Sequence, residues 1–156
     1  MKIHLIAIGT RMPAWVREGC AEYAKRVTGI CRLDLIEIAA AKRGKNADIA
    51  RAIQDEGERM LHTVPSSCHV IALERTGRRK STLELADALR GWLNDGRDVA
   101  LLVGGPEGLS TECLRRAHET WSLSELTLAH PLVRVVLAEQ IYRAWSIVNN
   151  LPYHRD

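Results

Sequence analysis

Four short apolar runs, each followed by a helical pattern, constrain the fold of this chain more than any other feature. The runs are rich in Ile, Leu and Val, and they cover residues 2–8, 32–38, 68–73 and 98–103. Runs of this length and composition are typical of strands that are buried on both faces of a sheet. Because strands and helices alternate, the sequence predicts an α/β fold with a mainly parallel sheet and helices on both faces.

Helix signals follow each of these runs. Apolar residues recur at helical spacing after Pro13 and, more loosely, after Asn46. Ser81 and Glu84 have the spacing of a capping box, which predicts the start of a third helix. A fourth, shorter helix is expected to start at Ser110. Each strand is thus followed by a helix that can carry the chain to the next parallel strand.

The C-terminal part of the chain predicts one more strand and one more helix. Residues 121–128 indicate a fifth strand and a turn, and Pro131 opens a helix that ends near Asn149. That helix is apolar around most of its circumference, so it is either central or shared with a second subunit, and we expect a homodimer. Glu139 and Arg143 are spaced as an exposed helical ion pair.

Length and composition place the chain among soluble globular proteins. It has 156 residues, of which 46% are hydrophobic and 26% charged, and it has no linker or internal repeat. We therefore expect residues 1–156 to form a single domain. No segment is apolar for long enough to span a membrane, and the start MKIHLIAIGTR lacks the features of a signal peptide. The expected location is the cytoplasm.

The cysteines do not indicate a metal or redox site. Cys20, Cys31, Cys68 and Cys113 lie far apart, without a CxxC pair and without histidines at ligand spacing. Free cysteine commonly behaves as a small core residue. We therefore expect these four thiols to be buried and reduced.

Basic residues are bunched, although the formal net charge is only +3. The two groups are Lys42, Arg43 and Lys45 in one segment, and Arg75, Arg78, Arg79 and Lys80 in another. Bunched cations at loops favour contact with a polyanion such as the backbone of a nucleic acid. Two solvated loops are the alternative, and spacing alone leaves both open.

The glycine-rich stretch LLVGGPEGLS, residues 101–110, includes one of three strand-end loops at which a parallel sheet is expected to bind its ligand. The other two loops follow residues 73 and 128. The stretch is neither a P-loop, which needs GxxxxGK[ST], nor the dinucleotide motif GxGxxG. Pro106 has no N–H and Glu107 repels phosphate, so a neutral or cationic nucleoside is the favoured ligand. The alternative is that the glycines only permit a tight turn between strand and helix.

Two further segments carry candidate ligand-binding residues. Residues 122–130, SLSELTLAH, either offer backbone groups and leucines to a purine or simply place leucines in the core. The tail LPYHRD contains Tyr153, His154 and Arg155: an aromatic ring, a group that titrates near neutral pH, and a permanent cation. Such a set suits an RNA base and its backbone, whereas a frayed terminus is the alternative.

These segments together resemble one family, the ribosomal RNA large-subunit methyltransferase H type of the SPOUT superfamily. The resemblance runs essentially from end to end, through IAIGTRMPAW, KRGKNADI, LLVGGPEGLS, SLSELTL, HPLVRVVLAEQIYRAWSI and PYHR. It implies S-adenosyl-L-methionine as the methyl donor, no metal, and N3 of a pseudouridine in helix 69 of 23S rRNA, within assembled 70S ribosomes, as the target. It also implies a homodimer and a deep trefoil knot at the C-terminal end. Another RNA target such as tRNA, and a non-catalytic ribosome-binding module, are the alternatives.

The resemblance also implies which residues bind the ligands. The cofactor pocket would be formed by Leu73, Gly104, Gly105, Leu123, Ser124, Glu125, Leu126, Thr127 and Leu128. The two basic groups would hold the backbone of the rRNA.

The catalytic roles are predicted from residue type and from position in the tail. The proton on N3 must leave, and His154 is the first candidate for the general base, with His130 second. Arg155 would stabilise negative charge on the base or hold a phosphate, and Tyr153 would stack on the base. The tail is expected to serve the partner subunit. Leu151 stands where the family commonly has a histidine.

Overall fold

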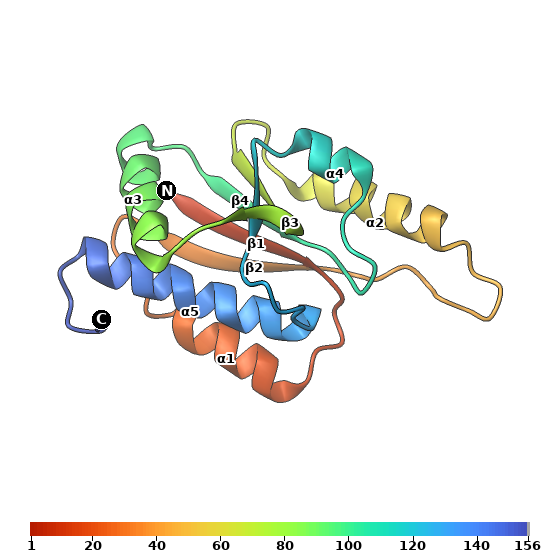
Figure 1. Cartoon of the computed structure of the whole chain (residues 1–156), viewed down its shortest axis with the longest axis horizontal. Coiled ribbons are helices and arrows are strands. Elements are labelled where there is room, and N and C mark those ends of the chain that lie inside the picture. The colour runs from red at the N-terminus through yellow and green to blue at the C-terminus, as the bar shows by residue number, and fades with distance from the viewer. Residues whose placement is uncertain (156) are drawn as a thin grey trace.

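A five-stranded parallel sheet forms the centre of the computed structural model, which describes residues 1–155 (Figure 1). The strands lie in the order β2-β1-β4-β3-β5, and all of their pairings are parallel. Their bounds are β1 Lys2–Ile8, β2 Arg32–Ile38, β3 His69–Arg79, β4 Val99–Val103 and β5 Glu119–Ser122. The predicted parallel sheet is confirmed. The deep knot stays a prediction.

Helices cover both faces of the sheet, as predicted. The helices are α1 Ala14–Ala24, α2 Ile49–Thr63, α3 Thr82–Asp95, α4 Thr111–Arg116 and α5 His130–Val148. On one face α5 packs between α1 and α3, and on the other face α2 packs against α4 (Figure 1). Helix α5 is therefore central within the subunit. Within residues 1–155, no helix is both long enough and apolar enough to cross a membrane.

Alternate residues of the strands supply two separate cores. In β1, Leu5 belongs to the core beneath α3 and α5, whereas Ile6 belongs to the core beneath α2 and α4. This follows from the two-residue period of a strand, which points successive side chains to opposite faces. The four cysteines are free and buried, as expected.

The helix starts predicted from capping residues are confirmed. Ser81 accepts a hydrogen bond from the backbone N–H of Glu84, whose side chain accepts one from Ser81 in return. Ser110 caps α4 through the N–H of Cys113. These caps satisfy backbone donors that have no partner inside the helix.

The strand and turn predicted within residues 121–128 divide after Ser122. Strand β5 covers Glu119–Ser122, and residues 123–128 lie outside it. The Ser122 hydroxyl donates to the carbonyl of Ser124, and the hydroxyl of Ser124 accepts from the N–H of Leu126. These local bonds turn the chain away from the sheet. The segment that follows β5 is consequently a loop that leads into α5.

The third strand is longer than predicted and continues to Arg79. Its register shifts between Leu73 and Arg78, and both of these residues lie opposite Trp121. Gly77 is needed at this crossing, because a Cβ there would lie 2.6 Å from the carbonyl carbon of Trp121. The second basic group therefore lies mainly along a strand and not in a loop.

Candidate functional site

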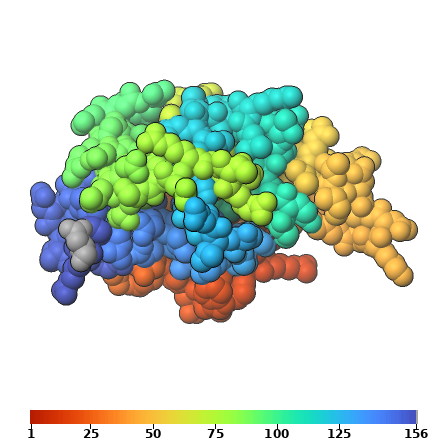
Figure 2. Space-filling view, in the orientation of Figure 1, coloured from red at the N-terminus to blue at the C-terminus, as the bar shows by residue number. Residues whose placement is uncertain are grey.

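A cavity of about 690 Å³ opens at the carboxyl edge of β3, β4 and β5. Its volume lies in the range of cavities that hold small ligands. In Figure 2 the segments near residues 75 and 125 lie side by side on the face shown, and both contribute to this cavity. The complete lining consists of residues 73–75, 103–108, 121–124, 126–130 and 133.

The predicted cofactor residues meet in this cavity, with one exception. Leu73, Gly104, Gly105, Leu123, Ser124, Leu126, Thr127 and Leu128 all line it. Glu125 does not; its carboxylate forms an ion pair with Arg79, and both side chains are exposed. Strand β3 and two loops, which are far apart in sequence, meet here because parallel strands run to the same edge of the sheet. The prediction of a loop after residue 73 is wrong, because residues 73–75 belong to β3.

The glycine loop forms one wall through very close backbone packing. A Cβ on Gly104 would lie 2.4 Å from the carbonyl carbon of Gly108, and Gly108 has a φ of +88°. The N–H of Gly108 donates to the carbonyl of Gly105 at 3.0 Å, which closes the turn. The glycines therefore permit the tight turn, as one of the two alternatives predicted, and they also line the cavity; their role in binding a nucleoside stays a prediction.

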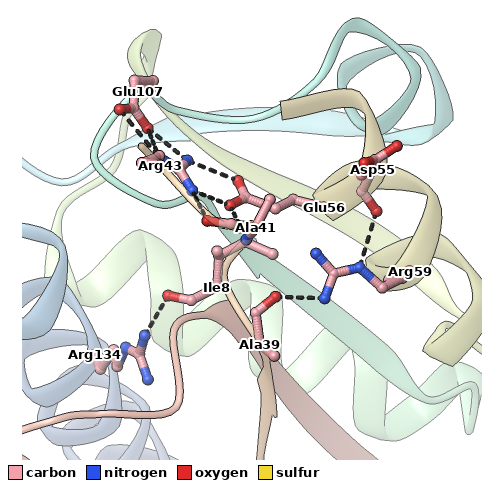
Figure 3. Close-up of polar contacts among 9 residues, drawn as sticks. All are labelled: Ile8, Ala39, Ala41, Arg43, Asp55, Glu56, Arg59, Glu107 and Arg134. Atoms are coloured by element: carbon pink, nitrogen blue, oxygen red, sulfur yellow. Dashed lines mark hydrogen bonds and ion pairs between the residues drawn. The ribbon is translucent and has the colours of Figure 1, made fainter. Parts of the chain in front are cut away.

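Arg43 joins this wall to α2 (Figure 3). Its guanidinium lies 2.6 Å from a carboxylate oxygen of Glu107 and 2.5 Å from one of Glu56. Both carboxylates raise the pKa of Arg43, and Arg43 lowers the pKa of Glu107. Lys42 and Lys45, which flank Arg43, are exposed. The structure thus gives Arg43 two protein partners and leaves its neighbours facing solvent.

His130 lies in the cavity at the first residue of α5. Its Nδ1 is buried and has no hydrogen-bond partner among the described residues. Burial, followed by the charges of Arg134 and Arg43, lowers the pKa of His130 below its usual range. The imidazole is therefore neutral near pH 7, the state in which it can accept a proton.

Arg134 is a buried residue of this region that the sequence analysis missed. It is fully buried, and it donates to a carboxylate oxygen of Glu37 at 2.9 Å and to the carbonyl of Ile8. Burial lowers its pKa. The sequence offers one signal for this residue, because Arg134 stands within an otherwise apolar stretch. A charge that is buried there needs a partner, which would have indicated an internal ion pair.

The tail residues lie at the other end of α5. The Tyr153 hydroxyl donates to Glu139 at 3.1 Å, its ring meets Tyr142 edge-on, and the guanidinium of Arg143 lies 4.7 Å from its centroid. From His130 to Arg143 the axis of α5 rises by about 20 Å. Within one chain, the structure therefore does not bring Tyr153, His154 and Arg155 to the cavity.

The expectation that Glu139 and Arg143 form an exposed pair is wrong. Their side chains are 19% and 25% exposed, because Tyr153 and neighbouring rings pack against them. Burial, followed by the hydrogen bond to Glu139, raises the pKa of Tyr153 to about 12. Tyr153 therefore stays protonated at neutral pH.

The second basic group divides into cations with different surroundings. Arg75 lines the cavity, and Arg78 and Arg79 are exposed, with carboxylates beside them. Lys80 is only 15% exposed; it lies 3.3 Å from Glu119 and over the ring of Trp121. Among residues 1–155, no group of three or more His, Cys, Asp or Glu side chains is placed to hold a metal ion.

Comparisons with known proteins agree with this architecture. Residues 1–154 match the family described as "Predicted SPOUT methyltransferase". The chain is 59% identical to "Ribosomal RNA large subunit methyltransferase H" of Thioalkalivibrio sulfidiphilus, over the full length of both chains.

Two solved structures share the fold at low sequence identity. A "probable methylase family protein" from Haemophilus influenzae is 16% identical, with a TM-score of 0.59 over 99% of this chain and 70% of that one. A "Probable Methyltransferase" from Bordetella pertussis is 14% identical, with a TM-score of 0.59 over 92% and 93% of the two chains.

Proposed function

The chain belongs to the SPOUT methyltransferase family, and we propose that it transfers a methyl group from S-adenosyl-L-methionine to 23S rRNA. The observation that carries the proposal is the cavity, in which strand β3 and two loops, all remote from one another in sequence, supply the predicted cofactor residues. The relative in Thioalkalivibrio sulfidiphilus, whose name describes a large-subunit rRNA methyltransferase, supports the substrate. The proposed target is N3 of a pseudouridine in helix 69, within assembled 70S ribosomes in the cytoplasm.

The lining of the cavity suits S-adenosylmethionine better than a phosphorylated cofactor. Leucines from β3 and from the loop after β5 can cover an adenine, while the glycine loop brings backbone groups close to the ligand. The lining holds Glu74 and Glu107 together with Arg75, and Glu107 is paired with Arg43. The lining therefore offers a phosphate no excess of positive charge. When bound, the cofactor supplies an electrophilic methyl group. The protein aligns it with the nucleophile and excludes water.

The chain also has to remove the imide proton from N3. His130 lies in the cavity and is neutral near pH 7, so one of its ring nitrogens is the acceptor that the same subunit can provide. His154 remains the second candidate, supplied by a partner subunit. An arginine from the tail, Arg155, would stabilise charge on the base or hold a phosphate, and Tyr153 would stack on the base.

A homodimer would complete the site. The tail of one chain lies about 20 Å along α5 from its own cavity. The same helix presents Leu132 and other apolar residues that are incompletely buried in the subunit. We therefore propose that the tail of each subunit serves the cavity of its partner. Lys42 and Lys45 are placed to hold the rRNA backbone beside it.

The test is to supply methyl-labelled S-adenosylmethionine with 70S ribosomes, isolated subunits and tRNA in parallel. Label is expected in the rRNA of the large subunit when 70S ribosomes are supplied, and mass spectrometry would identify the methylated nucleotide. Label found only in tRNA would overturn the proposed substrate. A protein that binds ribosomes but neither binds nor consumes the cofactor would support a non-catalytic module.

A further inference from the structure

We propose that Arg43 is a positioning residue for methyl transfer, because it holds the glycine-loop wall of the cavity in place through Glu56 and Glu107. The basic neighbours of Arg43 predict contact with RNA, but its own guanidinium is occupied by two carboxylates. The inference rests on the proposed function, since it concerns the binding of S-adenosylmethionine.

The guanidinium of Arg43 bridges two elements that are remote in sequence (Figure 3). It contacts Glu56 through two nitrogen–oxygen pairs, at 2.5 and 3.2 Å, and it contacts Glu107 at 2.6 and 3.1 Å. Glu56 belongs to α2, whereas Glu107 belongs to the cavity wall. A planar guanidinium with several donors can bind two carboxylates at once, whereas a lysine ammonium lacks this geometry.

The carboxylate of Glu56 is held in place by burial and by a second hydrogen bond. The Glu56 side chain is 2% exposed and also accepts a hydrogen bond from the N–H of Ala41 at 2.8 Å. At the next residue, α2 approaches the end of the glycine loop so closely that a Cβ on Gly57 would lie 2.1 Å from the Ser110 hydroxyl. The loop is thus packed against α2 at its end, and Arg43 restrains it at Glu107.

Arg59 offers a matched comparison in the same place. It also joins the segment after β2 to α2, by donating to the carbonyl of Ala39 at 2.6 Å and to that of Asp55 at 3.2 Å (Figure 3). The structure shows no contact between Arg59 and a residue of the cavity wall within residues 1–155. Both arginines therefore tie the segment that follows β2 to α2. Among the described residues, Arg43 also holds the glycine-loop wall of the cavity, and Arg59 does not.

The charges of this bridge also act on His130. Three charged groups affect its ring: Arg134 on α5, Arg43 on the segment after β2, and Glu107 in the glycine loop. Both arginines lower the pKa of His130, whereas Glu107 raises it. Changing Arg43 or Glu107 should therefore move the acidic limb of the pH–rate profile in opposite directions.

The experiment measures S-adenosylmethionine affinity by calorimetry for wild type, Arg43→Lys, Glu107→Gln, the double variant and Arg59→Lys. Glu107→Gln is the main variant because it leaves the buried pair of Arg43 and Glu56 intact. We expect about tenfold weaker binding for each single variant, which corresponds to about 1.4 kcal/mol, and no further loss in the double variant. Arg59→Lys should bind like wild type.

A second readout separates positioning from a general loss of structure. In the methylation pH–rate profile, Glu107→Gln should shift the acidic limb to lower pH. The neutral replacement Arg43→Gln/Glu56→Gln should shift it to higher pH, and it avoids leaving a buried carboxylate unpaired. Purely structural damage would lower the rate without opposite shifts.

Three outcomes would overturn the inference. These are wild-type affinity in Glu107→Gln, additive losses from Arg43→Lys and Glu107→Gln, or an equal loss in Arg59→Lys. Each of them would leave the proposed function standing, because wild type would still bind the cofactor. Failure of the wild type to bind S-adenosylmethionine would overturn the proposed function and this inference together.

Discussion

The amino end of α5 meets the cavity, whereas the carboxyl end is covered by the chain's own tail. At the amino end, His130 has a buried nitrogen without a partner among the described residues, next to the buried charge of Arg134. At the carboxyl end, Tyr153 is satisfied by Glu139 and packed against Arg143. The amino end of α5 therefore offers a ligand a polar group that is unpaired within residues 1–155. The polar groups at its carboxyl end are already paired within the chain.

This difference bears on how a complete site is assembled. The predicted catalytic residues are divided between the two ends, about 20 Å apart along the helix. A second copy related by a twofold axis would bring the tail of one chain to the cavity of the other. The division of residues along α5 therefore supports the proposal that two subunits together form each complete site.

The largest effect on cofactor affinity is expected from a substitution that displaces the glycine-loop wall at the cavity end of α5. Gly104→Ala would place a Cβ 2.4 Å from the carbonyl carbon of Gly108, so the wall must move. We expect about a hundredfold weaker S-adenosylmethionine binding by calorimetry, since overpacking costs about 1–3 kcal/mol. Gly91→Ala is the control, because Gly91 is an exposed residue of α3 with open space around it. Unchanged affinity in Gly104→Ala would remove the glycine loop from the cofactor site.

Mixed dimers test whether the two ends cooperate across subunits. One subunit carries Gly104→Ala and the other carries His154→Ala with Arg155→Ala. If tails serve partner cavities, one of the two sites is intact, and purified mixed dimers should show about half of wild-type methylation. Each parental homodimer should be much less active than the mixed dimer when S-adenosylmethionine is kept well below the weakened Kd of the Gly104→Ala subunit. Activity of the mixed dimer no higher than that of the homodimers would place the tail in its own subunit's site.

The pH dependence of methylation tests the role of the cavity end alone. Because the pKa of His130 is lowered, the neutral base persists below the usual range of histidine. We expect kcat/KM to stay constant from neutral pH down to below 6.5 and then to fall as His130 becomes protonated. His130→Ala should lower the rate and remove this limb. A limb that survives the substitution would assign it to another group.

The smallest effect is expected at the tail end. Tyr153→Phe removes the hydrogen bond to Glu139 but keeps the ring, so urea denaturation should show a loss of about 1 kcal/mol. The raised pKa, about 12, means that the folded protein holds the phenol proton more tightly than the unfolded chain. Stability from Tyr153 should therefore be lost as pH rises from about 10 towards 12, and Tyr153→Phe should lose this dependence. Equal stability of the two proteins would mean that the tail is not docked in solution.

Local patterns were sufficient to predict much of the fold. The apolar runs at residues 2–8 and 32–38 have the bounds of β1 and β2, and the capping residues Ser81 and Ser110 lie where α3 and α4 begin. For residues 121–128 the sequence predicted a strand and a turn but not the boundary between them, because the turn after Ser122 depends on serine hydroxyls. Propensity records which side chains suit a strand, but not which local hydrogen bonds will end it.

The site was predictable only in part. The cavity residues followed from motifs of the family, and the edge of the sheet at which they meet followed from the parallel strands. The segment directly after residue 73, predicted as a loop, lies within β3. The partners of Arg43 could not be predicted, because Glu56 and Glu107 are 13 and 64 residues away. For Arg134, Glu37 is 97 residues away. Pairs at such separations are fixed by the three-dimensional fold, so a single sequence does not reveal them.

During synthesis, β1 leaves the ribosome long before the helix that completes it. The carbonyl of Ile8 accepts a hydrogen bond from Arg134, which lies 126 residues later in the chain and is synthesised much later. Leu5 likewise belongs to the same core as Leu137 of α5, so this core is incomplete until α5 has been synthesised. A nascent chain without its last helix therefore exposes one apolar face of the sheet. This core is therefore completed only after α5 has been synthesised and packs on that face.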